Sequence, residues 1–303
     1  MKYCIHPDLK KAAYKMPFCK PLLYMSHLPL RMAFPFIKTP AGVSIKRETI
    51  SDNENATSAY VFRPENAAKK IPCLLYFHGG GFGYEAAPYH KVLSAIYAKH
   101  ANCAVIVPNY RLLPAYPFPA AKNDALNSYK WILQNARRLN IDINRIAVGG
   151  DSAGCVLAAH ICRSEPAPCF QMLIYPVADA KMSTRSMRRF TDTPLWNSTN
   201  NRKMWSAYLN GSGVPLSEIS PLQMKLGNFV PNAYIETAEF DCLHDEGILY
   251  ARKLKRSGSF VELNETRGTF HGYDIVLGSP VTKKNVSRRI KALRRAFGSK
   301  GKQ

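Results

Sequence analysis

The sequence predicts an α/β fold, with a mostly parallel central sheet and helices on both of its faces. The first observation is that short apolar runs alternate with helical patterns along the chain. The second is that two glycine-rich motifs each follow directly after such a run. The third is that 303 residues with 46% hydrophobic content can bury a sizeable core. We expect residues 1–303 to form a single domain.

Six apolar runs are expected to be strands. They are short and rich in branched and aromatic residues, which suits strands buried on both faces. Residues 121–138 and 153–163 lie between such runs and contain good helix formers, so we expect helices there. The expected strands cover residues 71–77, 103–108, 145–149, 170–176, 233–240 and 260–264.

The motif Gly150-Asp-Ser-Ala-Gly follows the run 145–149 and precedes an expected helix. A G-x-S-x-G motif between a strand and a helix forms a sharp turn that exposes its serine as a nucleophile. Glycines at positions 150 and 154 allow the helix to pack close to the strand. The run 71–77 is followed by His78-Gly-Gly-Gly, a motif that supplies backbone N–H groups for an oxyanion. Together the two motifs predict a serine hydrolase with Ser152 as its nucleophile.

A nucleophilic serine needs a base, and the base needs an orienting acid. Asp241 directly follows the run 233–240, and His271 lies in the loop after the last expected strand. The carboxyl ends of parallel strands meet at one edge of a sheet, so these residues should lie near Ser152. Asp245 and Glu246 are rivals for the acid, but they stand where a helix begins and acids act as caps. The order Ser, Asp, His differs from the His, Asp, Ser order of trypsin-like proteases.

Five motifs in order resemble the hormone-sensitive-lipase-like family of α/β-hydrolase esterases. The resemblance extends from about Ile71 to His271 and rests on the runs quoted at the end of this paragraph. It departs at two positions, because the family has proline where Cys242 stands and aspartate where Asn109 stands. Neither change removes a catalytic group, although the second concerns the surroundings of Arg111. The motifs are His78-Gly-Gly-Gly, Asn109-Tyr-Arg-Leu-Leu-Pro with Pro117-Phe-Pro-Ala-Ala, Gly150-Asp-Ser-Ala-Gly, Asp241-Cys-Leu-His-Asp-Glu-Gly and Phe270-His-Gly.

The resemblance implies an α/β-hydrolase fold with a helical cap, and it implies how the residues act. Ser152 attacks the ester carbonyl, His271 moves the proton, and Asp241 orients the imidazole, with an acyl-enzyme intermediate. The oxyanion is held by backbone N–H groups of Gly79, Gly80, Gly81 and Ala153. No metal or cofactor is required, and the scattered cysteines show no zinc-type spacing.

Residues of about 1–45 and 179–215 do not fit the core pattern, and by the resemblance we expect both to contribute to the cap. A cap favours small, short-chain acyl or acetyl esters over emulsified fat. Candidate substrate-binding residues are His78, Phe82, Tyr84, Asp151, Trp196 and Trp205, with Phe34 and Phe36 as further candidate walls. Of these, His78 is expected to shape the oxyanion loop more than to transfer protons, and Asp151 to belong to the turn in a structural or orienting role.

The net charge of +21 is concentrated at the two ends of the chain. Residues 1–50 hold nine Lys/Arg against two acids, and residues 252–303 hold fourteen against three. No nucleic-acid motif accompanies this charge, and no apolar stretch is long enough to span a bilayer. We expect a cytoplasmic protein, monomer or homodimer, with a small ester as its partner, without nucleic acid and without stable membrane insertion.

Two other functions remain open at this point. An amidase or formamidase could use the same three residues, since acyl transfer to water does not require an ester. A non-catalytic ligand receptor on the same scaffold is disfavoured because His271 is present.

Overall fold

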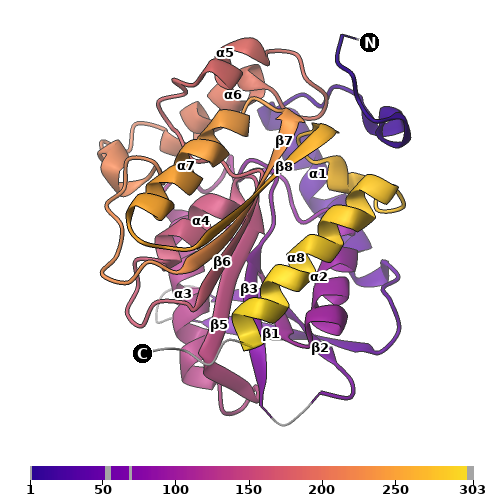
Figure 1. Ribbon diagram of the computed structural model, residues 1–303, viewed down its shortest axis with the longest axis vertical. Helices are drawn as coiled ribbons and strands as arrows, with labels where there is room; N and C mark the ends of the chain where they lie inside the picture. Colours follow the sequence, from indigo (N-terminus) through magenta and orange to yellow (C-terminus); the bar gives the residue numbers. More distant parts are fainter. Residues whose placement is uncertain (1, 52–55, 68–69, 299–303) are drawn as a thin grey trace.

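A computed structural model describes residues 2–51, 56–67 and 70–298 of the chain. Its centre is one eight-stranded sheet in the order β1-β2-β4-β3-β5-β6-β7-β8 (Figure 1). β1 pairs with β2, and β2 with β4, in antiparallel fashion, and every other neighbouring pair is parallel. The strands are β1 Val43–Ser51, β2 Ala56–Pro64, β3 Ile71–Phe77, β4 Ala104–Asn109, β5 Ile141–Asp151, β6 Phe170–Ile174, β7 Asn232–Phe240 and β8 Val261–Phe270.

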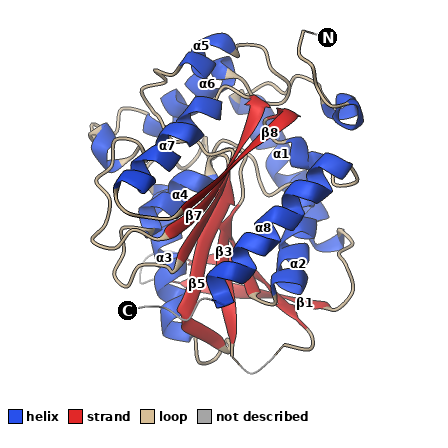
Figure 2. Cartoon of the chain, in the orientation of Figure 1, coloured by secondary structure: helices blue, strands red, loops and turns tan. Residues whose placement is uncertain are grey.

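Helices cover both faces of the sheet (Figure 2). α2 (Pro88–Ala101) and α8 (Pro280–Gly298) pack against each other on one face. α3 (Ala120–Asn135), α4 (Gly154–Ile161) and α7 (His244–Arg256) lie on the other. Every residue of β3 and of β6 is buried, as expected for central strands between two helical layers. The predicted α/β class with a mostly parallel sheet is confirmed.

The remaining helical segments form two groups and two short turns. The N-terminal group consists of η1 (Pro7–Ala12), α1 (Lys20–Ala33) and η2 (Phe34–Phe36). The group after β6 contains α5 (Arg185–Arg189) and α6 (Ser198–Leu209), which begin at the capping side chains of Thr184 and Asn197. Two short turns, η3 (Leu216–Glu218) and η4 (Tyr273–Ile275), complete the chain.

Hydrogen bonds join these two groups although they lie far apart in sequence. The Asn200 side chain donates to the Met16 carbonyl at 2.7 Å and accepts from the Phe18 N–H at 3.3 Å. The Leu195 N–H donates to the Tyr14 carbonyl at 2.8 Å. The N-terminal segment and the segment after β6 therefore form one connected layer.

The sequence patterns missed β1 and β2, and β1 begins at Val43, inside the segment that we expected to join the cap. β1 is an edge strand, and its middle residues Lys46, Arg47 and Glu48 interrupt any apolar run. The observed bounds of two other strands and one helix differ from the predicted ones. β5 begins at Ile141 and β8 extends to Phe270, while α3 ends at Asn135.

Candidate active site

Ser152 lies in a sharp turn between β5 and α4. Its φ of 53° is in the left-handed region, which a residue with a side chain adopts only when its surroundings enforce it. The helix comes so close to β3 that a Cβ at Gly154 would collide with the Phe77 carbonyl. A Cβ at Gly150 would meet the same carbonyl, so both glycines are required by close packing.

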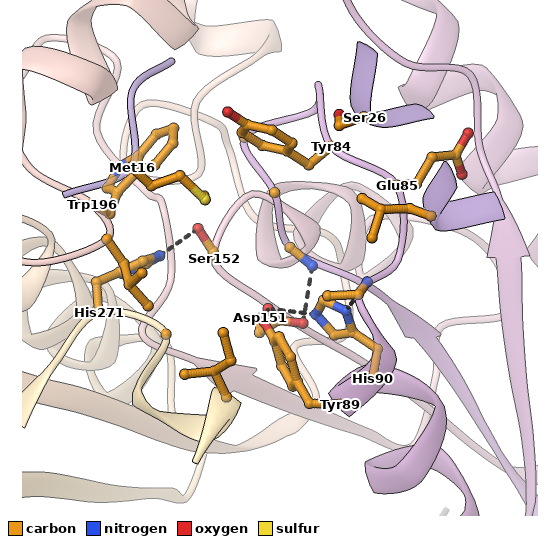
Figure 3. A pocket seen from close by; sticks show the side chains of 18 of the residues that line it. Met16, Ser26, Tyr84, Glu85, Tyr89, His90, Asp151, Ser152, Trp196 and His271 are labelled. Atoms are coloured by element: carbon orange, nitrogen blue, oxygen red, sulfur yellow. Dashed lines mark hydrogen bonds and ion pairs between the residues drawn. The ribbon is translucent and has the colours of Figure 1, made fainter. Parts of the chain in front are cut away.

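The structure brings Ser152, His271 and Asp241 into one hydrogen-bonded chain. Ser152 Oγ lies 2.8 Å from His271 Nε2, and His271 Nδ1 lies 2.7 Å from Asp241 Oδ2. In the tautomer that fits, Nδ1 donates to the carboxylate and Nε2 accepts from the serine hydroxyl. Figure 3 shows the Ser152 and His271 side chains pointing toward one another. Asp241 is fully buried, and its other oxygen accepts from the Leu243 N–H at 2.9 Å.

The two rival acids have other partners. Asp245 Oδ2 accepts from the Ser186 N–H at 2.8 Å, and Oδ1 lies 3.0 Å from His244 Nδ1. Glu246 Oε2 accepts from the N–H groups of Ala178 and Asp179. These carboxylates hold the segment after β6, whereas Asp241 faces His271.

The glycine loop after β3 divides into an anchored part and an open part. The Gly79 N–H donates to Asp151 Oδ1 at 3.0 Å, so it is already engaged. Within the described ranges, no acceptor bonds the N–H groups of Gly80, Gly81 or Ala153. Gly80 and Gly81 have φ values of 110° and 62°, a conformation that turns the loop backbone and favours glycine.

Asp151 anchors this loop through a network that sequence reasoning did not find. Its Oδ1 accepts from the Tyr76 hydroxyl at 3.0 Å as well as from Gly79, and its Oδ2 lies 3.1 Å from His90 Nε2. The Ala87 N–H donates to His90 Nδ1 at 2.8 Å, so Nε2 carries the proton and donates to Asp151. Burial alone would raise the pKa of Asp151, but His90 and the hydrogen bonds hold it below its ordinary value.

A second buried network holds the loop that carries His271. Arg289 of α8 is fully buried, forms ion pairs with Glu236 and Asp274, and donates to the Tyr97 hydroxyl at 3.1 Å. Asp274 accepts from the Tyr175 hydroxyl at 3.1 Å. The Tyr175 ring packs edge-on against the His271 imidazole with centroids 4.7 Å apart. Arg289 therefore connects α8 to the surroundings of the histidine.

A cavity of about 650 Å³ opens above Ser152 and His271. Its lining is mostly apolar, and it includes Gly79, Gly80 and Gly81 on one side. The N-terminal segment supplies Met16, Leu22, Met25, Pro29 and Leu30, and the segment after β6 supplies Leu195 and Trp196. This volume falls in the range of roughly 300–1,000 Å³ that small-molecule sites occupy.

The candidate wall residues separate into two groups. Tyr84, Trp196 and Asp151 line the cavity. His78, Phe82, Trp205 and Phe34 are buried outside its lining, and Phe36 is exposed outside it.

The buried candidates pack against neighbouring rings. Phe82 stacks on Tyr208 with centroids 3.9 Å apart, and His78 stacks on Tyr110 at 4.5 Å. Burial lowers the pKa of His78 to about 4, so this imidazole is neutral near pH 7. These stacked rings pack residues of the glycine loop against the protein core.

The structure accommodates the two residues that depart from the family pattern. Cys242 is fully buried. Asn109 donates to the Ser58 hydroxyl at 2.8 Å, while Arg111 pairs with Asp124 at 2.8 Å. Among the residues that the structure describes, no group of three His, Cys, Asp or Glu side chains could hold a metal ion.

Comparisons with known proteins identify the family of the chain. Residues 74–275 match the family model of the alpha/beta hydrolase fold. The chain is 32% identical to carboxylesterase NlhH of Mycobacterium tuberculosis over 247 residues, covering 78% of this chain and 77% of the relative. It is 34% identical to an ethyl acetate hydrolase of Pseudomonas putida over 225 residues, covering 70% of each. The crystal structure of esterase LipW from Mycobacterium marinum superposes with a TM-score of 0.90 at 29% identity, covering 97% of this chain and 96% of that one. The chain therefore belongs to the α/β-hydrolase family, among the hormone-sensitive-lipase-like carboxylesterases.

Proposed function

We propose that the protein is a serine carboxylesterase that hydrolyses short-chain acyl or acetyl esters through an acyl-enzyme intermediate. The observation that carries the proposal is the continuous hydrogen-bonded chain from Ser152 through His271 to Asp241. Ser152 and His271 line a mostly apolar cavity. Several relatives are named as esterases, and one of them as an ethyl acetate hydrolase. That name supports a small acyl group.

In the first half-reaction, Ser152 Oγ attacks the ester carbonyl carbon while His271 Nε2 takes the hydroxyl proton. The carbonyl electron pair moves onto oxygen, where the N–H groups of Gly80, Gly81 and Ala153 can donate to it. When the tetrahedral intermediate collapses, the alcohol leaves with the proton from His271. Asp241 keeps the imidazole oriented and stabilises its positive charge. Water then repeats the sequence on the acyl-enzyme, with His271 as its base, and releases the acid.

This assignment of oxyanion donors leaves out Gly79, whose N–H is engaged with Asp151. The role proposed for Gly79 is to fix the start of the loop. The preference for short acyl groups rests on the cap. A Cβ at Gly81 would strike the Trp196 ring, so Trp196 packs directly on the oxyanion loop and limits the space beside the nucleophile.

The test is hydrolysis of p-nitrophenyl esters from acetate to palmitate, with the wild type beside Ser152→Ala. We expect serine-dependent turnover that is highest for short chains. A maximum at long chains would overturn the chain-length preference. Absence of turnover, with Ser152 also unreactive toward an organophosphonate probe, would overturn the hydrolase itself and favour a ligand receptor. A matched ester and anilide pair measures the preference between esters and amides.

A further inference from the structure

Helix α1 and the short η2 turn present a row of large apolar side chains to solvent. Their exposed fractions range from about half to most of the side chain. We call these residues the α1 ridge: Tyr24 (56%), Met25 (72%), Leu28 (64%), Met32 (63%) and Phe36 (85%).

The α1 ridge differs from the other exposed apolar residues of the described chain. Single exposed apolar residues such as Ile143, Phe229 and Phe260 are ordinary on protein surfaces. In α1, however, Leu23 is the one buried residue of the helix, and it lies on the side opposite the ridge. A helix that turns most of its apolar residues outward marks an interaction surface.

The α1 ridge borders the entrance of the catalytic cavity. Met25 belongs to both, because it is exposed and also lines the cavity above Ser152. Tyr14 and Ile275 are likewise partly exposed and line the cavity. The mostly apolar lining of the cavity thus reaches from Ser152 to Met25 of the ridge.

The charge around the α1 ridge is positive. Between Asp8 and Glu48 the sequence contains eight Lys/Arg and no acid. Lys20 and Arg31 are exposed on α1 itself. Arg31, Arg47 and Arg111 line a groove of about 590 Å³ beside Leu28, in which Arg31 is paired with Glu85. The ridge is thus an apolar strip with basic borders.

We propose that the α1 ridge docks on an anionic lipid surface and holds the cavity entrance against it. Apolar side chains that enter the interface, with basic residues beside them, are the features of helices that lie on such surfaces. A second copy of the chain is a poorer occupant, because symmetric pairing would bring two basic, acid-free segments together. No helix of the described residues is long and apolar enough to cross a membrane.

Docking would deliver a particular class of substrate, namely esters of a short acyl group with an apolar alcohol that partitions into lipid. This part of the inference rests on the proposed function. The binding itself does not, so the two are measured separately.

The test is sedimentation of the full chain with vesicles. Ser152→Ala is used as the parent so that no lipid is hydrolysed. Vesicles of phosphatidylcholine with phosphatidylglycerol are compared with vesicles of phosphatidylcholine alone. The ridge variant carries Leu28→Ser, Met32→Ser and Phe36→Ser, and the matched control carries Ile143→Ser, Phe229→Ser and Phe260→Ser. We expect binding to the anionic vesicles, weakened by added salt, and reduced at least about tenfold in the ridge variant but not in the control.

Three results would overturn the proposal: no binding to anionic vesicles, equal binding to both kinds of vesicle, or equal loss in the ridge variant and its control. A concentration-dependent dimer that the ridge variant abolishes, without vesicle binding, would assign the ridge to a second copy. If the wild type hydrolyses a water-soluble ester but does not bind vesicles, the docking proposal is wrong and the proposed function stands. If the chain binds vesicles but the wild type hydrolyses no ester, the proposed function is wrong and the docking proposal stands.

Discussion

Two histidine–aspartate pairs lie beside Ser152, and they are built differently. His271 pairs with Asp241 at 2.7 Å, and His90 pairs with Asp151 at 3.1 Å. All four side chains are buried. In Figure 3, His271 and His90 lie on opposite sides of Ser152 and Asp151, two consecutive residues of the turn.

The difference lies in what the second nitrogen of each histidine meets. His271 Nε2 faces the Ser152 hydroxyl, which can give up a proton. His90 Nδ1 accepts from the backbone N–H of Ala87, which cannot. Asp151 also accepts hydrogen bonds from Tyr76 and Gly79. Asp241 instead bonds His271 and one backbone N–H. In the proposed mechanism the His271–Asp241 pair therefore moves protons, whereas the His90–Asp151 pair only braces the glycine loop.

We expect the largest loss of activity when the contact between His271 and Ser152 is removed. Ser152→Ala or His271→Ala should each lower kcat/KM by at least about 10⁴-fold, because each removes a proton-transfer partner. The double variant should be little worse than either single one, since the residues act as a unit. Additive losses in the kinetics of all three variants would contradict this.

Asp241→Asn should come next, with a loss in kcat on the order of 10³–10⁴-fold and an intact fold. The amide would favour the wrong histidine tautomer, while the side chain keeps its shape. Asp245→Asn is the matched control, because Asp245 bonds Ser186 and not His271. If Asp245→Asn loses more activity than Asp241→Asn, the assignment of the acid is wrong.

A third histidine near these pairs, His78, forms no ion pair with any acid in the described part of the chain, and we expect its effect to appear in stability. The pKa of His78 is lowered to about 4 by burial, from an ordinary value of 6.5. Between these pH values the unfolded chain binds more protons than the folded one, so stability falls as pH falls from about 6.5 to 4.

The contribution of His78 to this loss is roughly 3 kcal/mol over the whole window. His160, with a pKa of about 3, acts in the same direction. Urea unfolding of the wild type and His78→Asn at several pH values measures the effect. If the free energy of unfolding has the same pH dependence in both proteins, His78 does not cause the loss of stability.

The parts of the site that the sequence predicted are those with local signals. Ser152, Asp241 and His271 each follow an apolar run, and the carboxyl ends of parallel strands meet at one edge. The glycine loop was also visible as a motif. The motif does not show that the Gly79 N–H is engaged while the N–H groups of Gly80 and Gly81 are open. That difference depends on the direction of the Asp151 side chain.

His90 and Arg289 could not have been predicted from local patterns. His90 stands in α2, and its partner Asp151 is 61 residues away. Arg289 is one of many basic residues in α8, and nothing in the sequence distinguishes the one that turns inward to Glu236. Which residue of a helix faces the core here depends on how that helix packs against the sheet. Antiparallel β1 was missed for a related reason, since charged residues occupy its middle.

The smallest expected effect tests the second pair directly. His90→Ala removes a hydrogen bond to Asp151 but leaves Tyr76 and Gly79 in place. The oxyanion loop should become less well positioned, so kcat should fall about tenfold with KM nearly unchanged, less than the roughly 100–1,000-fold loss caused by deleting an oxyanion donor. The pH profile of kcat/KM should keep its shape, because His90 transfers no proton in the proposed mechanism. A shifted profile, or a loss as large as that of His271→Ala, would mean that both histidine–aspartate pairs take part in proton transfer.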